Sequence, residues 1–139
     1  MITQATQDTQ CGHWLTIIAE WAKSAKRRGK SWDVPAAYLI RLFSEGVCRL
    51  SGLPISPGSH SKDYRGRTVS ADRIDSGKDY VYGNVQPVHK RCNVAKQNLP
   101  DELFVELCRT IVRHWDKTHE PVNLTPAELA DKLAEHPMI

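Results

Sequence analysis

The sequence predicts an α+β fold, in which a two-stranded hairpin and a short helix are embedded in a mainly helical single domain. Two segments that favour β structure, 68–72 and 81–85, enclose a turn-forming stretch at 76–79. Side chains at helical spacing follow, through position 96. Apolar residues also recur at helical spacing on both sides of this ββα unit. The 139 residues suffice for one modest core.

Two helices are predicted before the ββα unit. The first spans about 11–28, because its large apolar residues recur at helical spacing, whereas residues 1–10 are polar and are expected to fray. The second spans 36–45, with Asp33 as a suitable N-cap and Pro35 inside the first turn. The domain organisation is therefore a flexible N-terminus (1–10), a helical region (11–46), the ββα module (47–98) and C-terminal helices (99–139).

Two further helices are predicted after the ββα unit. The first spans about 99–114 and carries a broad apolar stripe, which we expect to lie in the core. The second spans 126–135, with Asn123 or Thr125 as its cap. The expected core stripe consists of Leu103, Phe104, Leu107, Cys108, Ile111, Val112 and Trp115.

Composition points to an ordinary globular protein: 40% of the residues are hydrophobic, 25% are charged, and the net charge is +3. No apolar run approaches the roughly 18 residues that a membrane span needs, and the N-terminus lacks a signal-peptide pattern. We therefore expect a cytoplasmic protein without membrane contact. In that reducing compartment, scattered cysteines are expected to be free thiols or metal ligands. They are Cys11, Cys48, Cys92 and Cys108.

The segment from about 48 to 98 carries a recognisable pattern. It runs Asp72-Arg73-Ile74-Asp75, then Tyr80, then Gly83-Asn84-Val85, and finally Cys92-Asn93-x-x-Lys96. In order and spacing it resembles the HNH endonucleases of the His-Me finger superfamily, particularly the small versions that phages and mobile elements encode. The resemblance covers about a third of the chain. It implies a ββα-metal module and a phage or mobile-element origin, which would place the protein in a bacterial host cell.

The resemblance assigns roles to individual residues. Asp72 falls on the metal-binding Asp, Asn84 on the Asn that orients the catalytic loop, and Asn93 on the helix residue that gives the second metal ligand. One carboxylate and one amide oxygen suit a hard ion such as Mg²⁺ or Mn²⁺. The implied activity is metal-dependent hydrolysis of phosphodiester bonds in duplex DNA, by nicking or double-strand cleavage, without a small-molecule cofactor.

The sequence does not identify which residue would act as the general base. Arg73 stands where the family has its general-base His, and a guanidinium cannot take a proton, so Arg73 is better suited to clamp a phosphate. Asp75, His89 and His60 are the alternative proton acceptors. Asp72 also has a purely structural alternative, a salt bridge to Arg73 or Lys96.

A structural zinc is a further open alternative. Relatives in this family often carry two Cys-x-x-Cys knuckles that hold zinc, and this chain has Cys48-x-x-Ser51 and His89-x-x-Cys92 in their place. Cys48, His89 and Cys92 are the potential ligands, and Ser51 is a poor fourth. Otherwise the two cysteines pack as small buried residues.

Clustered basic residues are the candidate DNA contacts, because Lys and Arg give salt-dependent affinity for phosphates. Lys26, Arg27 and Arg28 end the first predicted helix, and Arg65 and Arg67 lie in a basic loop. Lys96 on the ββα helix could also contact phosphate. The alternative is that these charges are merely solvated.

Three hypotheses result: an HNH-type endonuclease, a DNA-binding protein that keeps the fold but has lost cleavage, and a small structural or inhibitory protein that uses the fold as a scaffold. The first two are separated by whether Asp72 and Asn93 converge on a metal with an ionisable group nearby. The sequence leaves the oligomeric state undetermined.

Overall fold

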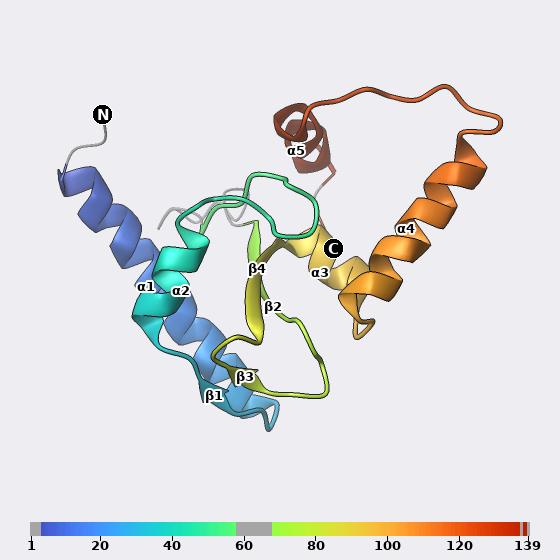
Figure 1. The fold of residues 1–139 in the computed structure, drawn as a ribbon. Helices are drawn as coiled ribbons and strands as arrows, with labels where there is room; N and C mark the ends of the chain where they lie inside the picture. The colour runs from blue at the N-terminus through green and yellow to red at the C-terminus, as the bar shows by residue number, and fades with distance from the viewer. Residues whose placement is uncertain (1–3, 58–67, 137, 139) are drawn as a thin grey trace.

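The computed structural model describes residues 4–57, 68–136 and 138, with side chains from Trp14 onward. It has a mixed α and β architecture in which small strand pairs are surrounded by helices (Figure 1). Within the described residues, no helix has the length and apolar character needed to cross a bilayer. The elements, in chain order, are α1 (Gln4–Arg27), β1 (Trp32–Asp33), α2 (Ala36–Phe43), β2 (Val69–Arg73), β3 (Tyr80–Val81), β4 (Val85–His89), α3 (Lys90–Lys96), α4 (Asp101–Trp115) and α5 (Pro126–Ala134).

The central element is an antiparallel ribbon of β2 and β4, in which Val69 pairs with His89 and Arg73 pairs with Val85. The predicted return strand at 81–85 was wrong, because β3 pairs in parallel with β1 and the ribbon is closed by β4. Pro87, which we expected in the first helical turn, lies inside β4 opposite Ala71. A proline is tolerated there because a two-stranded ribbon leaves one edge of each strand unpaired.

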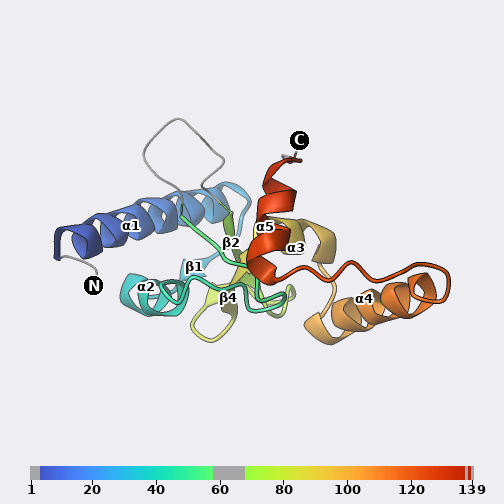
Figure 2. The same cartoon turned by 90° about the horizontal axis from the view of Figure 1, so that it is seen from above.

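Helices cover both sides of the ribbon. α1 and α2 lie on one side and α3 on the other (Figures 1 and 2). Phe43 of α2 is fully buried, and its ring centroid lies 5.6 Å from that of Trp14 and 5.4 Å from that of Trp21 on α1. The hydrophobic core therefore lies between α1, α2 and the ribbon, where Leu39, Val85 and Val88 are also buried.

The N-terminal helices differ in detail from the prediction. α1 begins at Gln4, so positions 4–10 are helical where fraying was expected. α2 ends at Phe43, and its N-cap is Pro35 without a side-chain hydrogen bond. Asp33 does not cap α2, because its backbone is extended and pairs with Val81 in the contact between β1 and β3.

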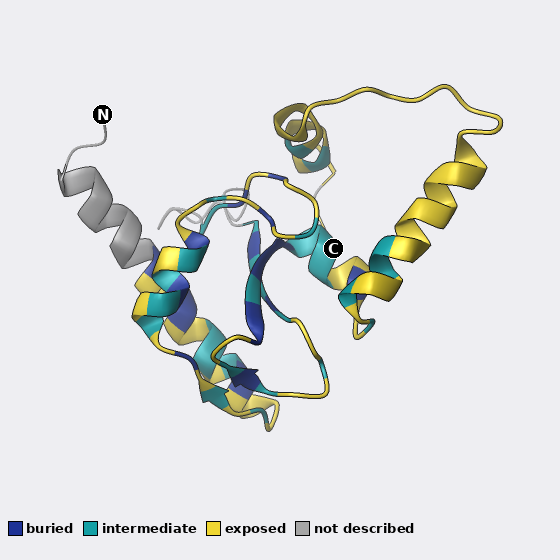
Figure 3. Ribbon diagram, in the orientation of Figure 1, coloured by how far each residue is buried: buried dark blue, intermediate teal, exposed yellow. Residues whose placement is uncertain are grey.

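The C-terminal helices give the largest correction. α4 has no buried residue, so its apolar stripe is not part of the core (Figure 3). The helix leads away from the rest of the molecule (Figure 1), and Asp101 in its first turn pairs with Lys96 of α3 at 2.6 Å. α5 agrees with the prediction: Thr125 caps it in a capping box with Glu128. The guanidinium of Arg91 on α3 donates to the Leu133 carbonyl of α5 at 3.2 Å.

Candidate functional site

The seam between β2 and α3 brings together the residues expected to hold a metal. Successive residues of a strand point to opposite faces, so Ser70 and Asp72 share the face of β2 on which α3 packs. From α3, the Asn93 amide donates to the Ser70 hydroxyl at 2.7 Å. Lys96, one helical turn later, places its Nζ 2.6 Å from Asp72 Oδ2. Asp72 and Asn93 therefore both lie in the seam between β2 and α3, but each forms a hydrogen bond with a different partner.

Lys96 is the centre of a buried polar cluster. Its side chain is 1% exposed, and its Nζ lies 2.6 Å from carboxylate oxygens of both Asp72 and Asp101. The Gln86 amide bridges the same two carboxylates, at 2.9 Å and 3.1 Å. Burial disfavours the charged form of Lys96, but the hydrogen bonds that its ammonium donates to the two carboxylates outweigh this cost and raise its pKa above the ordinary value.

This arrangement does not fit a divalent ion at Asp72. The carboxylate is 4% exposed, and the ammonium of Lys96 already supplies the positive charge that a metal would bring. Across 4–57, 68–136 and 138, no three side chains among His, Cys, Asp and Glu are grouped so that they could hold an ion. The geometry matches the alternative of a salt bridge from Asp72 to Lys96. The sequence suggested that Lys96 could contact a phosphate. Because its side chain is buried, Lys96 is not placed to do so.

Arg73 lies on the opposite face of β2 from Asp72. Its Nη1 donates to the carbonyls of Ser76 and Lys78 at 2.9 Å and 3.1 Å, which fixes the loop after β2. Its guanidinium carbon also lies 5.4 Å from the centroid of the Tyr80 ring. The position to which the resemblance assigns the general base is therefore occupied by the cation Arg73, which holds a loop in place through hydrogen bonds.

A second cation reaches the same ring from the turn that follows α1. Arg28 Nη2 donates to the Tyr80 hydroxyl at 3.1 Å, and its guanidinium carbon lies 5.7 Å from the ring centroid. Lys30 and Arg73 both stand close enough to Asp79 to help lower its pKa, although the backbone hydrogen bond from Ser31 is the main cause. We call this assembly the basic corner, and it comprises Lys26, Arg27, Arg28, Lys30 and Arg73.

Asn84 holds the loop that joins β2 to β3. Its side-chain Oδ1 accepts from the Asp75 amide at 2.9 Å, and its Nδ2 donates to the carbonyls of Asp75 and Asp79 at 3.1 Å and 2.9 Å. The side chain is buried, so these bonds replace its contacts with water. Asp75 is exposed, and its Oδ1 accepts from the Gly77 amide at 2.9 Å. Asn84 thus fixes the shape of the loop, and the Asp75 carboxylate stabilises the turn within it.

His89 does not join Asp72. It pairs with Val69 across the ribbon, on the face opposite Ser70 and Asp72, and its Nδ1 accepts from the Arg91 amide as the N-cap of α3. Burial is the main reason that the pKa of His89 is lowered, with the charges of Arg91 and Lys90 adding to it and that of Cys48 opposing it. A neutral, capping imidazole on this face has no access to the β2–α3 seam.

Cys48 and Cys92 form a thiol pair beside His89. The Cys92 thiol donates to Cys48, which lowers the pKa of Cys48 and raises that of Cys92. The Ser51 backbone amide also points at Cys48 Sγ, at 3.4 Å, while the Ser51 hydroxyl accepts from Leu53. The Ser51 hydroxyl also hydrogen-bonds to the pair and acts to lower the pKa of both thiols, and His89 uses Nδ1 as a cap. Among the residues that the structure describes, no three His, Cys, Asp or Glu side chains are grouped here to hold an ion, and the knuckles are held by hydrogen bonds and packing.

Part of the chain is similar to a known phage protein. The chain is 30% identical over 83 residues to an uncharacterized 29.0 kDa protein in the dda-modA intergenic region of Enterobacteria phage T4. The match covers 60% of this chain, and the chain spans about a third of the phage protein's length. A phage origin is compatible with this similarity. No protein-family model matches the chain, and no solved structure matches it.

Some sequence-based assignments lie outside the described residues, namely His60, Arg65 and Arg67. The sequence-based interpretation missed two features. One is that Asp101 supplies a second carboxylate partner for Lys96. The other is that two guanidinium groups lie over the ring of Tyr80. The signal for Asp101 was its position just after the helix that carries Lys96. For Tyr80, no local pattern pointed to Arg28.

Proposed function

We propose that this chain binds duplex DNA through a ββα module of the HNH type, without an ion at Asp72. The observation that supports this proposal is the basic corner. The turn just after α1 and the end of β2 are far apart in the sequence, yet Arg28 and Arg73 converge on Tyr80. Lys26 and Arg27 extend the cluster along exposed positions of the last helical turn.

Elementary electrostatics favours phosphate as the ligand of this corner. Positive side chains brought together repel one another, and a polyanion relieves that repulsion while it releases its own condensed counterions. Arg28 is held by Tyr80 and Arg73 by backbone carbonyls, so less side-chain entropy is lost when the corner meets a DNA backbone. Such contacts give affinity and orientation without sequence specificity.

Binding of a labelled duplex, measured by fluorescence anisotropy over a range of salt concentrations, tests this proposal. We expect log affinity to fall linearly with log salt. The double variant Lys26→Ala/Arg27→Ala should weaken binding and reduce the slope by about two. The control Arg41→Ala/Lys117→Ala removes the same charge from exposed positions elsewhere and should keep the slope. Salt-independent affinity, or an equal loss in both variants, would contradict the proposal.

Metal-dependent cleavage is the second candidate, and one observation favours it. Asp72 and Asn93 both lie in the seam between β2 and α3, as the resemblance to HNH endonucleases implies. Asn84 fixes the loop between β2 and β3. Cleavage with Mg²⁺ or Mn²⁺ would require Asp72 to exchange Lys96 for the ion. Nicking of a supercoiled plasmid that Asp72→Asn abolishes would establish this activity, whereas nicking unaffected by Asp72→Asn would remove Asp72 from it.

A further inference from the structure

The thiol pair of Cys48 and Cys92 joins two segments that the fold holds next to each other. Cys48 lies in the loop after α2, and Cys92 lies on α3. The Arg49 amide donates to the Pro87 carbonyl at 2.9 Å, so the loop is fixed to β4, the strand that leads directly into α3. Both cysteines are free thiols, and the Cys92 thiol donates to Cys48. A bond between the two sulfurs would therefore replace a contact that the folded chain already makes.

The two sulfurs have different surroundings. Cys48 is 1% exposed, and its Sγ accepts hydrogen bonds from the Cys92 thiol, the Ser51 hydroxyl and the Ser51 amide. Several donors directed at one sulfur stabilise its thiolate, which is the nucleophilic form of cysteine. The thiolate of the pair therefore belongs on Cys48, and the remaining proton belongs on Cys92.

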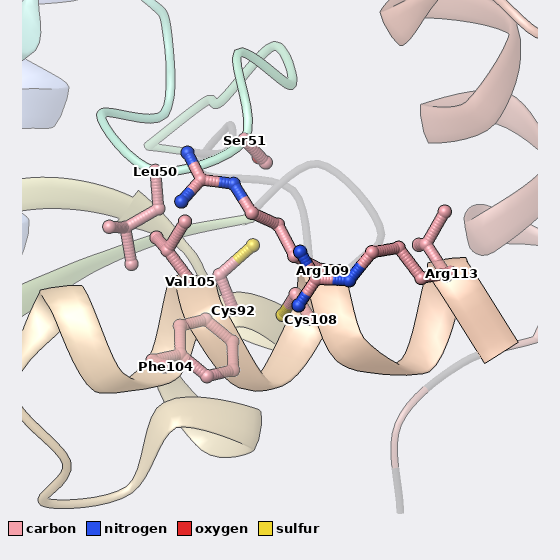
Figure 4. A pocket seen from close by; sticks show the side chains of 9 residues that line it. Leu50, Ser51, Cys92, Phe104, Val105, Cys108, Arg109 and Arg113 are labelled. Atoms are coloured by element: carbon pink, nitrogen blue, oxygen red, sulfur yellow. The ribbon is translucent and has the colours of Figure 1, made fainter.

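A cavity gives small molecules a route to this pair. It has a volume of about 500 Å³ and lies between α4 and the loop that carries Ser51 (Figure 4). Ser51 and Cys92 line this cavity, and both donate to Cys48. Cys48 thus lies directly behind the cavity wall, where a molecule as small as hydrogen peroxide can reach it through a local opening of that wall.

We propose that Cys48 and Cys92 form a reactive dithiol, which hydrogen peroxide closes to an intramolecular disulfide and a small thiol reopens. The Cys48 thiolate attacks one peroxide oxygen, the O–O bond breaks, hydroxide leaves, and Cys48 becomes a sulfenic acid. The Cys92 sulfur then attacks the Cys48 sulfur. The S–S bond forms, and the sulfenic oxygen leaves as water with the Cys92 proton. Each sulfur gives up one electron, and the peroxide takes both.

Cys108 is the competing partner for Cys92, because it lines the same cavity. It is exposed, and it is closer to Cys92 in the sequence than Cys48 is. In an unfolded chain the shorter loop closes more easily, which favours a bond between Cys92 and Cys108. In the folded chain the Cys92 thiol is directed at Cys48 by its hydrogen bond. A selective bond between Cys48 and Cys92 is therefore a property of the fold, and it does not depend on DNA binding.

Peptide mapping by mass spectrometry tests this proposal. The full chain is treated briefly with hydrogen peroxide, its remaining thiols are alkylated, and it is digested without reduction. We expect linked Cys48 and Cys92 peptides as the main product, and dithiothreitol should restore both thiols. The same treatment in urea should instead favour the bond between Cys92 and Cys108. A folded chain that keeps Cys48 and Cys92 as thiols, or that links mainly through Cys108 or between chains, would overturn the proposal.

Two single variants provide a matched second arm, since each keeps three of the four cysteines. Cys108→Ser should form the intramolecular disulfide as fast as the wild-type chain. Cys48→Ser keeps both cysteines of the cavity, yet it should form any disulfide at least about tenfold more slowly, because the stabilised thiolate is lost. Equal rates in the two variants would overturn the proposal. The comparison between folded and urea-treated wild-type chains needs no variant, so it decides the matter even if Cys48→Ser does not fold.

Discussion

The β2–α3 seam and α4 distribute polar and apolar groups in opposite ways. At the seam, charged and amide side chains are buried, and Asp72, Lys96 and Gln86 contact one another at hydrogen-bond distance. On α4, large apolar side chains face solvent. The ribbon and α3 bury their polar groups against one another, whereas α4 leaves apolar side chains exposed within the described part of the chain.

The largest expected effect lies at the seam. Lys96→Met would leave the buried Asp72 and the half-buried Asp101 without their common counter-ion. We expect the free energy of unfolding, measured with urea, to fall by about 3–5 kcal/mol. The control Lys117→Met, at an exposed position, should change it by less than about 0.5 kcal/mol. A loss below about 1 kcal/mol for Lys96→Met would show that the ion pairs contribute little.

Two valines sharpen the comparison between the buried ribbon and the exposed helix. Val88 in β4 is fully buried, whereas Val112 in α4 is 54% exposed. Val88→Ala should cost about 2 kcal/mol through lost burial and a small cavity. Val112→Ala should be neutral or slightly stabilising, because alanine favours helix. Urea denaturation at low protein concentration measures both, and equal losses would place α4 within the core.

The smallest expected effect is a pH dependence at His89. Because its pKa is lowered in the folded chain, the unfolded chain takes up a proton more readily, and stability falls as the pH drops below about 6.5. His89→Asn keeps an N-cap acceptor but cannot titrate. We expect that variant to show a shallower loss of stability between pH 6.5 and 5 in urea titrations. Parallel pH profiles for the two proteins would exclude His89 as the source.

Much of the architecture could be predicted from local patterns. Helical spacing located α1, and the Thr125 cap with Pro126 located the start of α5. The return strand was misplaced because Val81 and Tyr82 favour β structure, whereas the true strand contains Pro87. Local preference cannot reveal that Val81 pairs with β1, which is a tertiary contact.

The site was harder to predict than the fold. The resemblance to HNH endonucleases implied that Asn93 and Asp72 face each other, and the structure places both in the seam between β2 and α3. Periodicity does not reveal that Lys96 lies between Asp72 and a carboxylate at the start of the next helix. For α4 it identified an apolar face, but not whether that face is covered by this chain. In both regions, the missing information is which segments distant in sequence become neighbours.

The central claim is that Lys96, and not a divalent ion, satisfies Asp72. Titration of the wild-type chain with Mn²⁺ by isothermal calorimetry, alongside Asp72→Asn, tests it most directly. We expect no binding event that depends on Asp72, so the two titrations should coincide. A one-site binding curve in the wild-type chain that Asp72→Asn removes would contradict the role of Lys96 and favour metal-dependent cleavage.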